Sequence, residues 1–161
     1  MWERLHRFSR LNSAARRLFL RAFILLPLVS LSLRFRGFRA TQATLQKRLD
    51  ATNASRLSTP GLALAPDVVP RTVQMVQAAV RHGFGSPNCL EISLTLWWLL
   101  ARQDAVSTIR IGTRRVDSRL EAHAWVECGG IPLNEFEHPH YHYAPFDAAF
   151  PSLPESGPNS S

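Results

Sequence analysis

Cys89 and His123 are the two residues of this chain whose types suit nucleophilic catalysis. Cys89 stands where a helix is expected to begin, directly after Asn88, a residue that favours the N-cap position. A thiol at that point lies beside unpaired backbone N–H groups and the positive end of the helix dipole, and both favour the thiolate. His123 lies in the middle of an expected strand over residues 121–128. An imidazole beside the thiolate would complete a nucleophile, and only the fold can bring the two residues together.

The elements around these two residues predict an α+β fold. A helix of about three turns is expected from Pro70 to Gly83, and a second, heavily apolar helix is expected from Cys89 to Arg102. The second helix contains no Gly or Pro, so we expect it to be buried within the domain. Strands are expected at 106–111 and 121–128, with a charged turn at 113–118 between them. The pair Gly129-Gly130 then predicts a hairpin into residues 131–135, which gives a small antiparallel sheet.

Length and charge set the domain organisation. The chain has 161 residues and 45% hydrophobic content, which suits a single domain with a modest core. Its first 48 residues carry a net charge of +10, whereas the remaining 113 carry −3. We therefore divide the chain into a basic helical N-terminal arm over 1–50, a linker or long loop over 51–69, a core over 70–147 and a disordered tail over 148–161.

The basic arm contains a twelve-residue, mostly apolar stretch, 22–33, between Arg21 and Arg34. Because spanning a bilayer takes about 20 apolar residues, this stretch is expected to be too short to cross. Arginines follow it where a secretory signal would have small residues and a cleavage site, so secretion is not expected. Three roles remain open for the arm: packing on the core, peripheral membrane contact, and docking of a protein or peptide. No nucleic-acid-binding motif accompanies the positive charge, so no nucleic acid is expected.

Two cysteines, Cys89 and Cys128, do not make a disulfide framework in a chain of this size. A reducing, cytoplasmic location is the expectation. His138, His140 and His142 alternate in sequence, but Pro139 indicates a loop there and four well-spaced ligands are missing. We therefore expect no metal and no cofactor.

Three motifs together resemble the leader peptidases of lasso-peptide biosynthesis, the microcin-processing, transglutaminase-like cysteine protease family. The resemblance is strong over residues 65–137, and it is carried by Asn88-Cys89-Leu90-Glu91, Ile109-Arg110-Ile111-Gly112 and His123-Ala124-Trp125-Val126-Glu127. It implies a papain-like, transglutaminase-like core in 70–147, with N-terminal helices, a buried nucleophile helix and a small antiparallel sheet. It also implies removal of a leader peptide from a ribosomally synthesised precursor peptide, with a leader-binding protein and a separate macrolactam-forming cyclase as partners. Cys89 would be the nucleophile, and His123 the general base and then the acid.

A third catalytic residue should orient His123. The resemblance implies an Asp about twelve positions after the His, where this chain has Glu135, with Asn134 beside it. A two-residue turn at Gly129-Gly130 would put Asn134 on the His123 face of the sheet, whereas a three-residue loop would pair 135 with 123. We favour Glu135, because a carboxylate stabilises imidazolium better than an amide does, and Asn134 is the alternative.

Two further expectations concern the site and its alternatives. The Cys89 backbone N–H is a candidate oxyanion donor, and Trp125 either lines the substrate cleft or belongs to the core. Two other functions remain open. A transglutaminase-like acyl transferase would use the same Cys-His pair, and a non-catalytic scaffold would only bind precursor or membrane.

Overall fold

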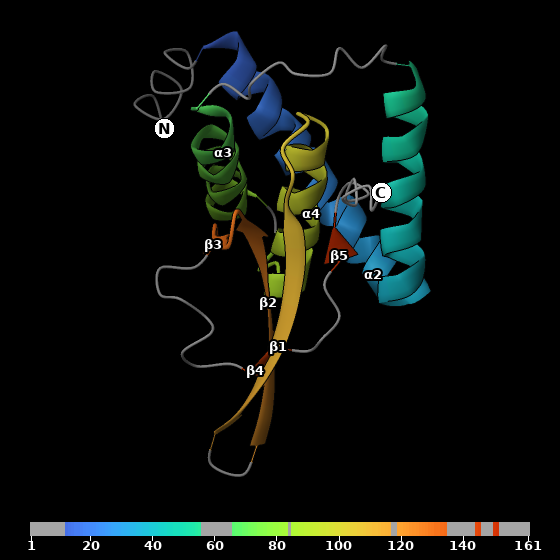
Figure 1. Cartoon of the computed structure of the whole chain (residues 1–161), viewed down its shortest axis with the longest axis vertical. Helices are drawn as coiled ribbons and strands as arrows, with labels where there is room; N and C mark the ends of the chain where they lie inside the picture. The colour runs from blue at the N-terminus through green and yellow to red at the C-terminus, as the bar shows by residue number, and fades with distance from the viewer. Residues whose placement is uncertain are drawn as a thin grey trace, which may run out of the picture.

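The computed structural model describes residues 12–55, 66–83, 85–116, 119–134, 144–145 and 150–151. In this part of the chain, three helices precede five strands (Figure 1). The helices are α2 (Ser13–Ser55), α3 (Val68–His82) and α4 (Cys89–Ala101), and the strands are β1 (Thr108–Val116), β2 (Arg119–Cys128), β3 (Ile131–Pro132), β4 (Ala144–Pro145) and β5 (Phe150–Pro151). The predicted α+β fold, with helices followed by a small antiparallel sheet, is confirmed.

Helix α2 is a helical hairpin that turns at Gly37. The backbone there has φ 74° and ψ 176°, a conformation that glycine adopts and residues with a Cβ avoid. Around the turn, Ser32 Oγ is hydrogen-bonded to Thr41 Oγ1 at 2.8 Å, and Thr41 Oγ1 donates to the carbonyl of Gly37 at 2.8 Å. These bonds tie the first half of α2 (residues 13–36) to the second half (residues 38–55), which turns back from it in Figure 1.

The length of α2 changes the expectation for the apolar stretch. The stretch 22–33 is part of a helix that is long and apolar enough to cross a membrane. The prediction that this segment is too short to cross is therefore wrong about its length. By length and composition alone, α2 fits a membrane span or an N-terminal signal as well as a helix of a soluble protein. Only 22% of its most apolar 18-residue stretch is buried. Residues 51–55, which the sequence places in a linker, continue α2.

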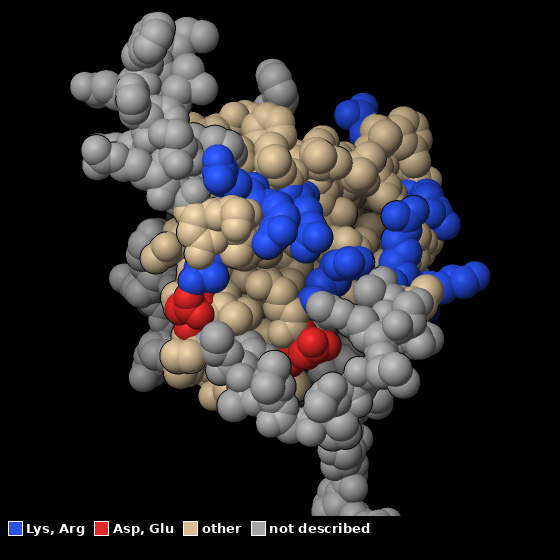
Figure 2. Space-filling view, turned by 90° about the horizontal axis from the view of Figure 1, so that it is seen from above, with Lys and Arg blue, Asp and Glu red and all other residues tan. Residues whose placement is uncertain are grey.

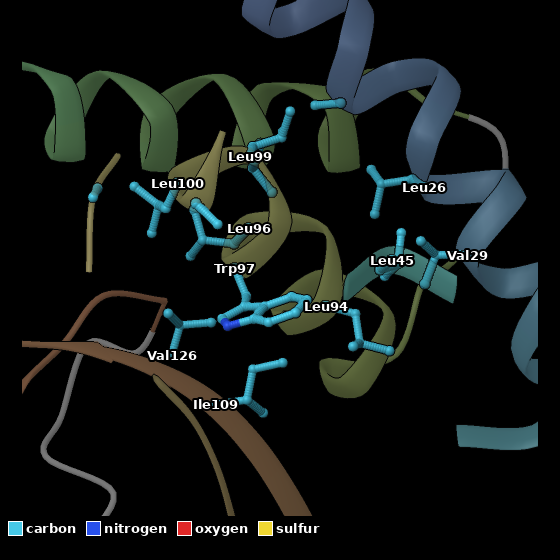
Figure 3. Packing of buried hydrophobic residues seen from close by; sticks show 14 of the residues in the cluster. Leu26, Val29, Leu45, Leu94, Leu96, Trp97, Leu99, Leu100, Ile109 and Val126 are labelled. Carbon is cyan, nitrogen blue, oxygen red and sulfur yellow. The ribbon is translucent and has the colours of Figure 1, made fainter. Parts of the chain in front are cut away.

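Helix α4 is the centre of the core, because it contacts α2, α3, β1 and β2. Nine of its thirteen residues are buried, so the prediction of a buried helix that begins at Cys89 is confirmed. Figure 3 shows the Trp97 ring close to Val126 and Ile109 of the sheet, with Leu26 and Val29 of α2 beyond it. The burial of these apolar side chains fixes α4 between the helices and the sheet.

The sheet is built on the long hairpin of β1 and β2. Its strand order is β3-β2-β1-β4, β5 also pairs with β1, and all pairs are antiparallel. Strand β1 extends to Val116 instead of ending near Ile111, because its pairing with β2 continues to the end of both strands. Gly129 and Gly130 form the predicted hairpin turn, with φ of 58° and 78° and Cys128 paired to Ile131.

Replacement of Gly37 tests the turn in α2. Gly37→Ala should lower the free energy of unfolding by about 1–3 kcal/mol, because a Cβ is strained at this φ and ψ. Ala43→Gly, at an exposed position of the second half of α2, should cost only about 0.5–1 kcal/mol. Urea unfolding followed by circular dichroism measures both. Equal stability of Gly37→Ala and the wild type would mean that α2 does not turn at this residue.

Candidate functional site

A capping box sets the first residue of α4 at Cys89. The Asn88 side chain accepts a hydrogen bond from the Glu91 N–H at 3.0 Å, and the Glu91 carboxylate accepts one from the Asn88 N–H at 2.9 Å. The N-cap predicted from the sequence is thus confirmed. Since Glu91 is buried, the box also anchors the start of the helix in the protein.

The helix start leaves hydrogen-bond donors next to the thiol. The N–H groups of Cys89 and Leu90 stand in the first turn, where an α-helix has no acceptor for them. A pocket of about 340 Å³, bounded by α2, the end of α3 and residues 85–88, extends to Asn88 and Glu91. The start of α4 therefore combines a half-buried thiol, two backbone donors and an adjacent hollow.

His123 lies in a row of side chains along one face of β2. Its ring is stacked on that of Trp125, with centroids 6.3 Å apart and 19° between the planes. Gly112 is its partner on β1, so no side chain of that strand crowds the imidazole in this row. The ring is half-buried, and Trp125 limits its movement on one side.

A charged pair holds Trp125 in place. Its indole Nε1 donates to Glu127 Oε1 at 2.7 Å, and Arg110 Nε lies 3.2 Å from Glu127 Oε2. Glu127 and Trp125 are both buried. The ion pair with Arg110 therefore offsets part of the free-energy cost of burying the Glu127 carboxylate. Arg110 thus contacts Glu127, Glu127 contacts Trp125, and the Trp125 ring stacks on one side of the His123 ring.

Ser93 joins α4 to the edge of β2 on the side of β3. Its Oγ donates to the carbonyl of Ala124 at 3.0 Å and accepts from Asn134 Nδ2 at 3.2 Å, while Asn134 Oδ1 accepts from the N–H of Val126 at 2.8 Å. Strand β3 pairs only with Glu127 and Cys128, and the N–H of Leu133 continues the ladder to the Val126 carbonyl. The two side chains therefore satisfy the β2 backbone groups beyond this short strand.

This edge contact relates the two predicted catalytic residues. Ser93 is one helical turn after Cys89 on the same side of α4, and Ala124 directly follows His123. The core face of β2 carries Val126, so alternation puts the His123 ring on the opposite face. No hydrogen bond between the Cys89 thiol and His123 occurs among the described residues. Their two elements are joined by the bond of Ser93 to Ala124.

Among the other residues considered for the site, the structure describes Asn134 and Trp125 but not Glu135 or the three histidines. The Asn134 amide is engaged with Val126 and Ser93, although the two-residue turn gives the register that was expected to favour Asn134. Glu135 lies outside the described residues, as do His138, His140 and His142. Trp125 is fully buried beside His123, and its contact with substrate stays a prediction.

Four residues with contacts around the site were not predicted from the sequence: Ser93, Glu91, Arg110 and Glu127. The spacing from Asn88 to Glu91 is that of a capping box and was readable from the sequence. Ser93 is four residues after Cys89, which places it on the same helix face, but its acceptor on β2 is 31 positions away in the chain. No local pattern could have identified that acceptor.

Comparison with known proteins gives one family. A family model described as the transglutaminase-like superfamily matches residues 25–147, which includes α4, the sheet hairpin and much of α2. No curated protein and no solved structure matches the chain.

Two hydroxyls on α4 provide a matched test of the edge contact. Ser93→Ala should lower the free energy of unfolding by about 1–3 kcal/mol, because Ala124 and Asn134 lose a buried partner. Thr95→Val removes an equally buried hydroxyl that has no hydrogen-bond partner among the described residues, so it should be neutral or stabilising. Denaturant unfolding of both variants measures the difference. Similar losses in the two would show that the Ser93 bonds do not join α4 to β2.

Proposed function

Since the chain belongs to the transglutaminase-like superfamily, in which cysteine-based peptidase or acyltransferase activity is common, we propose that it is a cysteine peptidase. It removes the leader peptide from a ribosomally synthesised precursor during lasso-peptide biosynthesis. The observation that carries this assignment is a helix that begins at Cys89 and is bonded through Ser93 to the strand of His123. The resemblance of the motifs around both residues to leader peptidases supports the choice of substrate.

The chemistry follows from the two residues. His123 takes the proton of the Cys89 thiol, and the thiolate attacks the scissile carbonyl to form a tetrahedral oxyanion. The N–H groups at the start of α4 stabilise that oxyanion. His123 then gives its proton to the leaving amine, and the acyl group remains on sulfur. Water, deprotonated by His123, releases the acyl group and restores the thiol.

Glu135 is the residue that we assign to orient the His123 ring. The Asn134 amide is already hydrogen-bonded to Val126 and Ser93, so we assign Asn134 a structural role in holding the strand. Strand β3 ends at Pro132 and the backbone bends at 133–134, so strand alternation does not decide which side Glu135 occupies. A carboxylate there would keep the ring in the tautomer that accepts the thiol proton.

The proposed setting is the cytoplasm, where a leader-binding protein presents the precursor peptide and a macrolactam-forming cyclase acts on the product. Acyl transfer is the alternative within the superfamily. It would need the same thioester, with an amine in place of water in the second step.

Reconstitution tests the assignment. The purified chain, mixed with its precursor peptide and leader-binding protein, should release the leader as a free acid that mass spectrometry detects. Cys89→Ala and His123→Ala should abolish cleavage, with a fall of about a thousandfold or more. Cys128→Ala is the matched control, because Cys128 is also a half-buried free thiol and should be dispensable.

Three outcomes would contradict the peptidase assignment. Cleavage by Cys89→Ala would exclude the thiol as nucleophile. Conversion of the leader end to an amide in the presence of an added amine, without hydrolysis in its absence, would indicate acyl transfer. Failure of iodoacetamide to label Cys89 faster than Cys128 in the wild type, with no loss on His123→Ala, would indicate a scaffold.

Glu135 and Asn134 can be separated by two readouts. Glu135→Gln should lower kcat about a hundredfold or more with little change in stability, because it removes the charge that stabilises imidazolium. Asn134→Ala should lower the free energy of unfolding by about 1–3 kcal/mol, because buried groups lose their partners. Steady-state kinetics and thermal unfolding distinguish these effects. Full activity of Glu135→Gln would remove Glu135 from the mechanism.

A further inference from the structure

The first half of α2 has two apolar faces, and the described part of the protein covers only one of them. The covered face packs on α3 and α4, and its buried side chains are Ala15, Leu18, Ala22, Leu26 and Val29. The other face carries an apolar stripe, which consists of Leu20, Ile24, Leu28, Leu31 and Phe35. Each residue of the stripe is between 49% and 75% exposed. A helix that is apolar all round is normally enclosed, but among the described residues nothing covers the stripe.

The stripe is continuous along the helix. Its residues follow one another at intervals of three or four positions, which places them on one side of an α-helix. From Leu20 to Phe35 it extends for about 22 Å at 1.5 Å per residue. An exposed apolar surface of this kind marks a site of interaction with a protein or a membrane.

Arginines lie at both ends of the stripe. Arg16, Arg17 and Arg21 are exposed at one end, and Arg34, Arg36 and Arg39 are exposed at the other. No Asp or Glu occurs between Glu3 and Asp50, so no carboxylate of this region offsets their charge. Figure 2, which looks down on the end of the molecule where α2 begins, shows Lys and Arg gathered across the face, with Asp and Glu toward its lower edge.

We propose that the stripe lies in the surface of an anionic lipid bilayer, with the first half of α2 parallel to the membrane. The apolar side chains would enter the boundary between headgroups and acyl chains, and the arginines at each end would pair with lipid phosphates. The complementarity is specific, because a membrane surface presents anions at one level and apolar material directly beneath them.

The packing of α2 favours this orientation over a helix that crosses the bilayer. Leu26 and Val29 belong to the same core cluster as Leu94 and Trp97 of α4. A crossing helix would have to leave that cluster and expose its apolar partners to water. A helix that lies on the surface keeps its buried face in the protein and places only the stripe in lipid.

The shape of the surface also favours lipid over a peptide. The stripe is the exposed side of a single helix, whereas the hollows of about 340 Å³ and 230 Å³ lie at its sides. Leu31 and Arg34 line the first, and Leu28 and Arg36 line the second. The apolar stripe thus lies on the outer side of one helix, with an arginine in the lining of each neighbouring hollow. Such a surface suits contact with a bilayer, whereas an extended peptide needs a concave site.

Vesicle flotation with the full-length chain tests this surface. The chain should float with vesicles of phosphatidylcholine containing roughly 30% phosphatidylserine. Its affinity for vesicles of phosphatidylcholine alone should be lower by a factor of about ten or more. High salt, about 1 M, should release most of the bound protein, since it screens the arginines. Ile24→Ser combined with Leu28→Ser should reduce binding about tenfold or more.

The chain offers a matched control for these changes. Val106 and Leu120 are also large apolar residues, 59% and 75% exposed, but they lie outside α2. Val106→Ser combined with Leu120→Ser should bind vesicles as the wild type does. Circular dichroism and thermal unfolding establish that each variant is folded. Cys89→Ala should also float normally, so the result does not depend on the peptidase assignment.

Three results would overturn the membrane surface. The first is unchanged flotation of folded Ile24→Ser/Leu28→Ser. The second is protein that remains in the vesicles after an alkaline carbonate wash, which would indicate a crossing helix. The third is a wild-type chain that ignores anionic vesicles but binds the purified leader-binding protein through Ile24 and Leu28, which would make the stripe a protein interface.

Discussion

The bonds of Ser93 are the constraint on which the rest of the site depends. One hydroxyl connects the helix that begins at Cys89, the strand that carries His123 and the side chain of Asn134. Beyond the described pairing of β2 with β3, these side chains bond to the backbone of β2 and settle the position of α4 along it. The capping box at Asn88 then determines which residue of α4 comes first. Together they set the start of α4 one helical turn before its contact with the strand of His123.

The two faces of β2 carry different kinds of side chains. Val126 and its neighbours in the core hold α4 against the sheet, while His123, Trp125 and Glu127 form a row on the other face. The buried Glu127 carboxylate, paired with Arg110, keeps the indole in place, and the indole supports the imidazole. Arg110 is therefore connected to the His123 ring through Glu127 and Trp125.

Helix α2 differs from α4 because one of its apolar faces is exposed. Its turn at Gly37 divides one helical segment into two halves, and the first half presents the apolar stripe. The sequence predicted a stretch too short to cross a bilayer, because the count stopped at Arg21 and Arg34, and it left peripheral membrane contact open. The helix continues through both arginines, and exposed guanidinium groups at the ends of an apolar stripe suit a surface location.

Local signals were enough to predict much of the fold. The apolar pattern after Asn88 indicated a buried helix that starts at Cys89, the Gly-Gly pair indicated the turn into β3, and alternation separated His123 from Val126. These features depend on residues close in the chain, where capping, backbone conformation and periodicity act directly. The motifs around Cys89 and His123 were also sufficient to indicate the transglutaminase-like superfamily.

Other features were decided only by the tertiary structure. The partner of Ser93, the engagement of Asn134 and the Arg110 ion pair join residues far apart in the chain, and no local pattern specifies which groups will meet. The exposed face of α2 was equally hidden, because apolar residues on both sides of a helix do not reveal which side the protein covers. Packing makes that choice, since α3 and α4 can cover only one face of the helix.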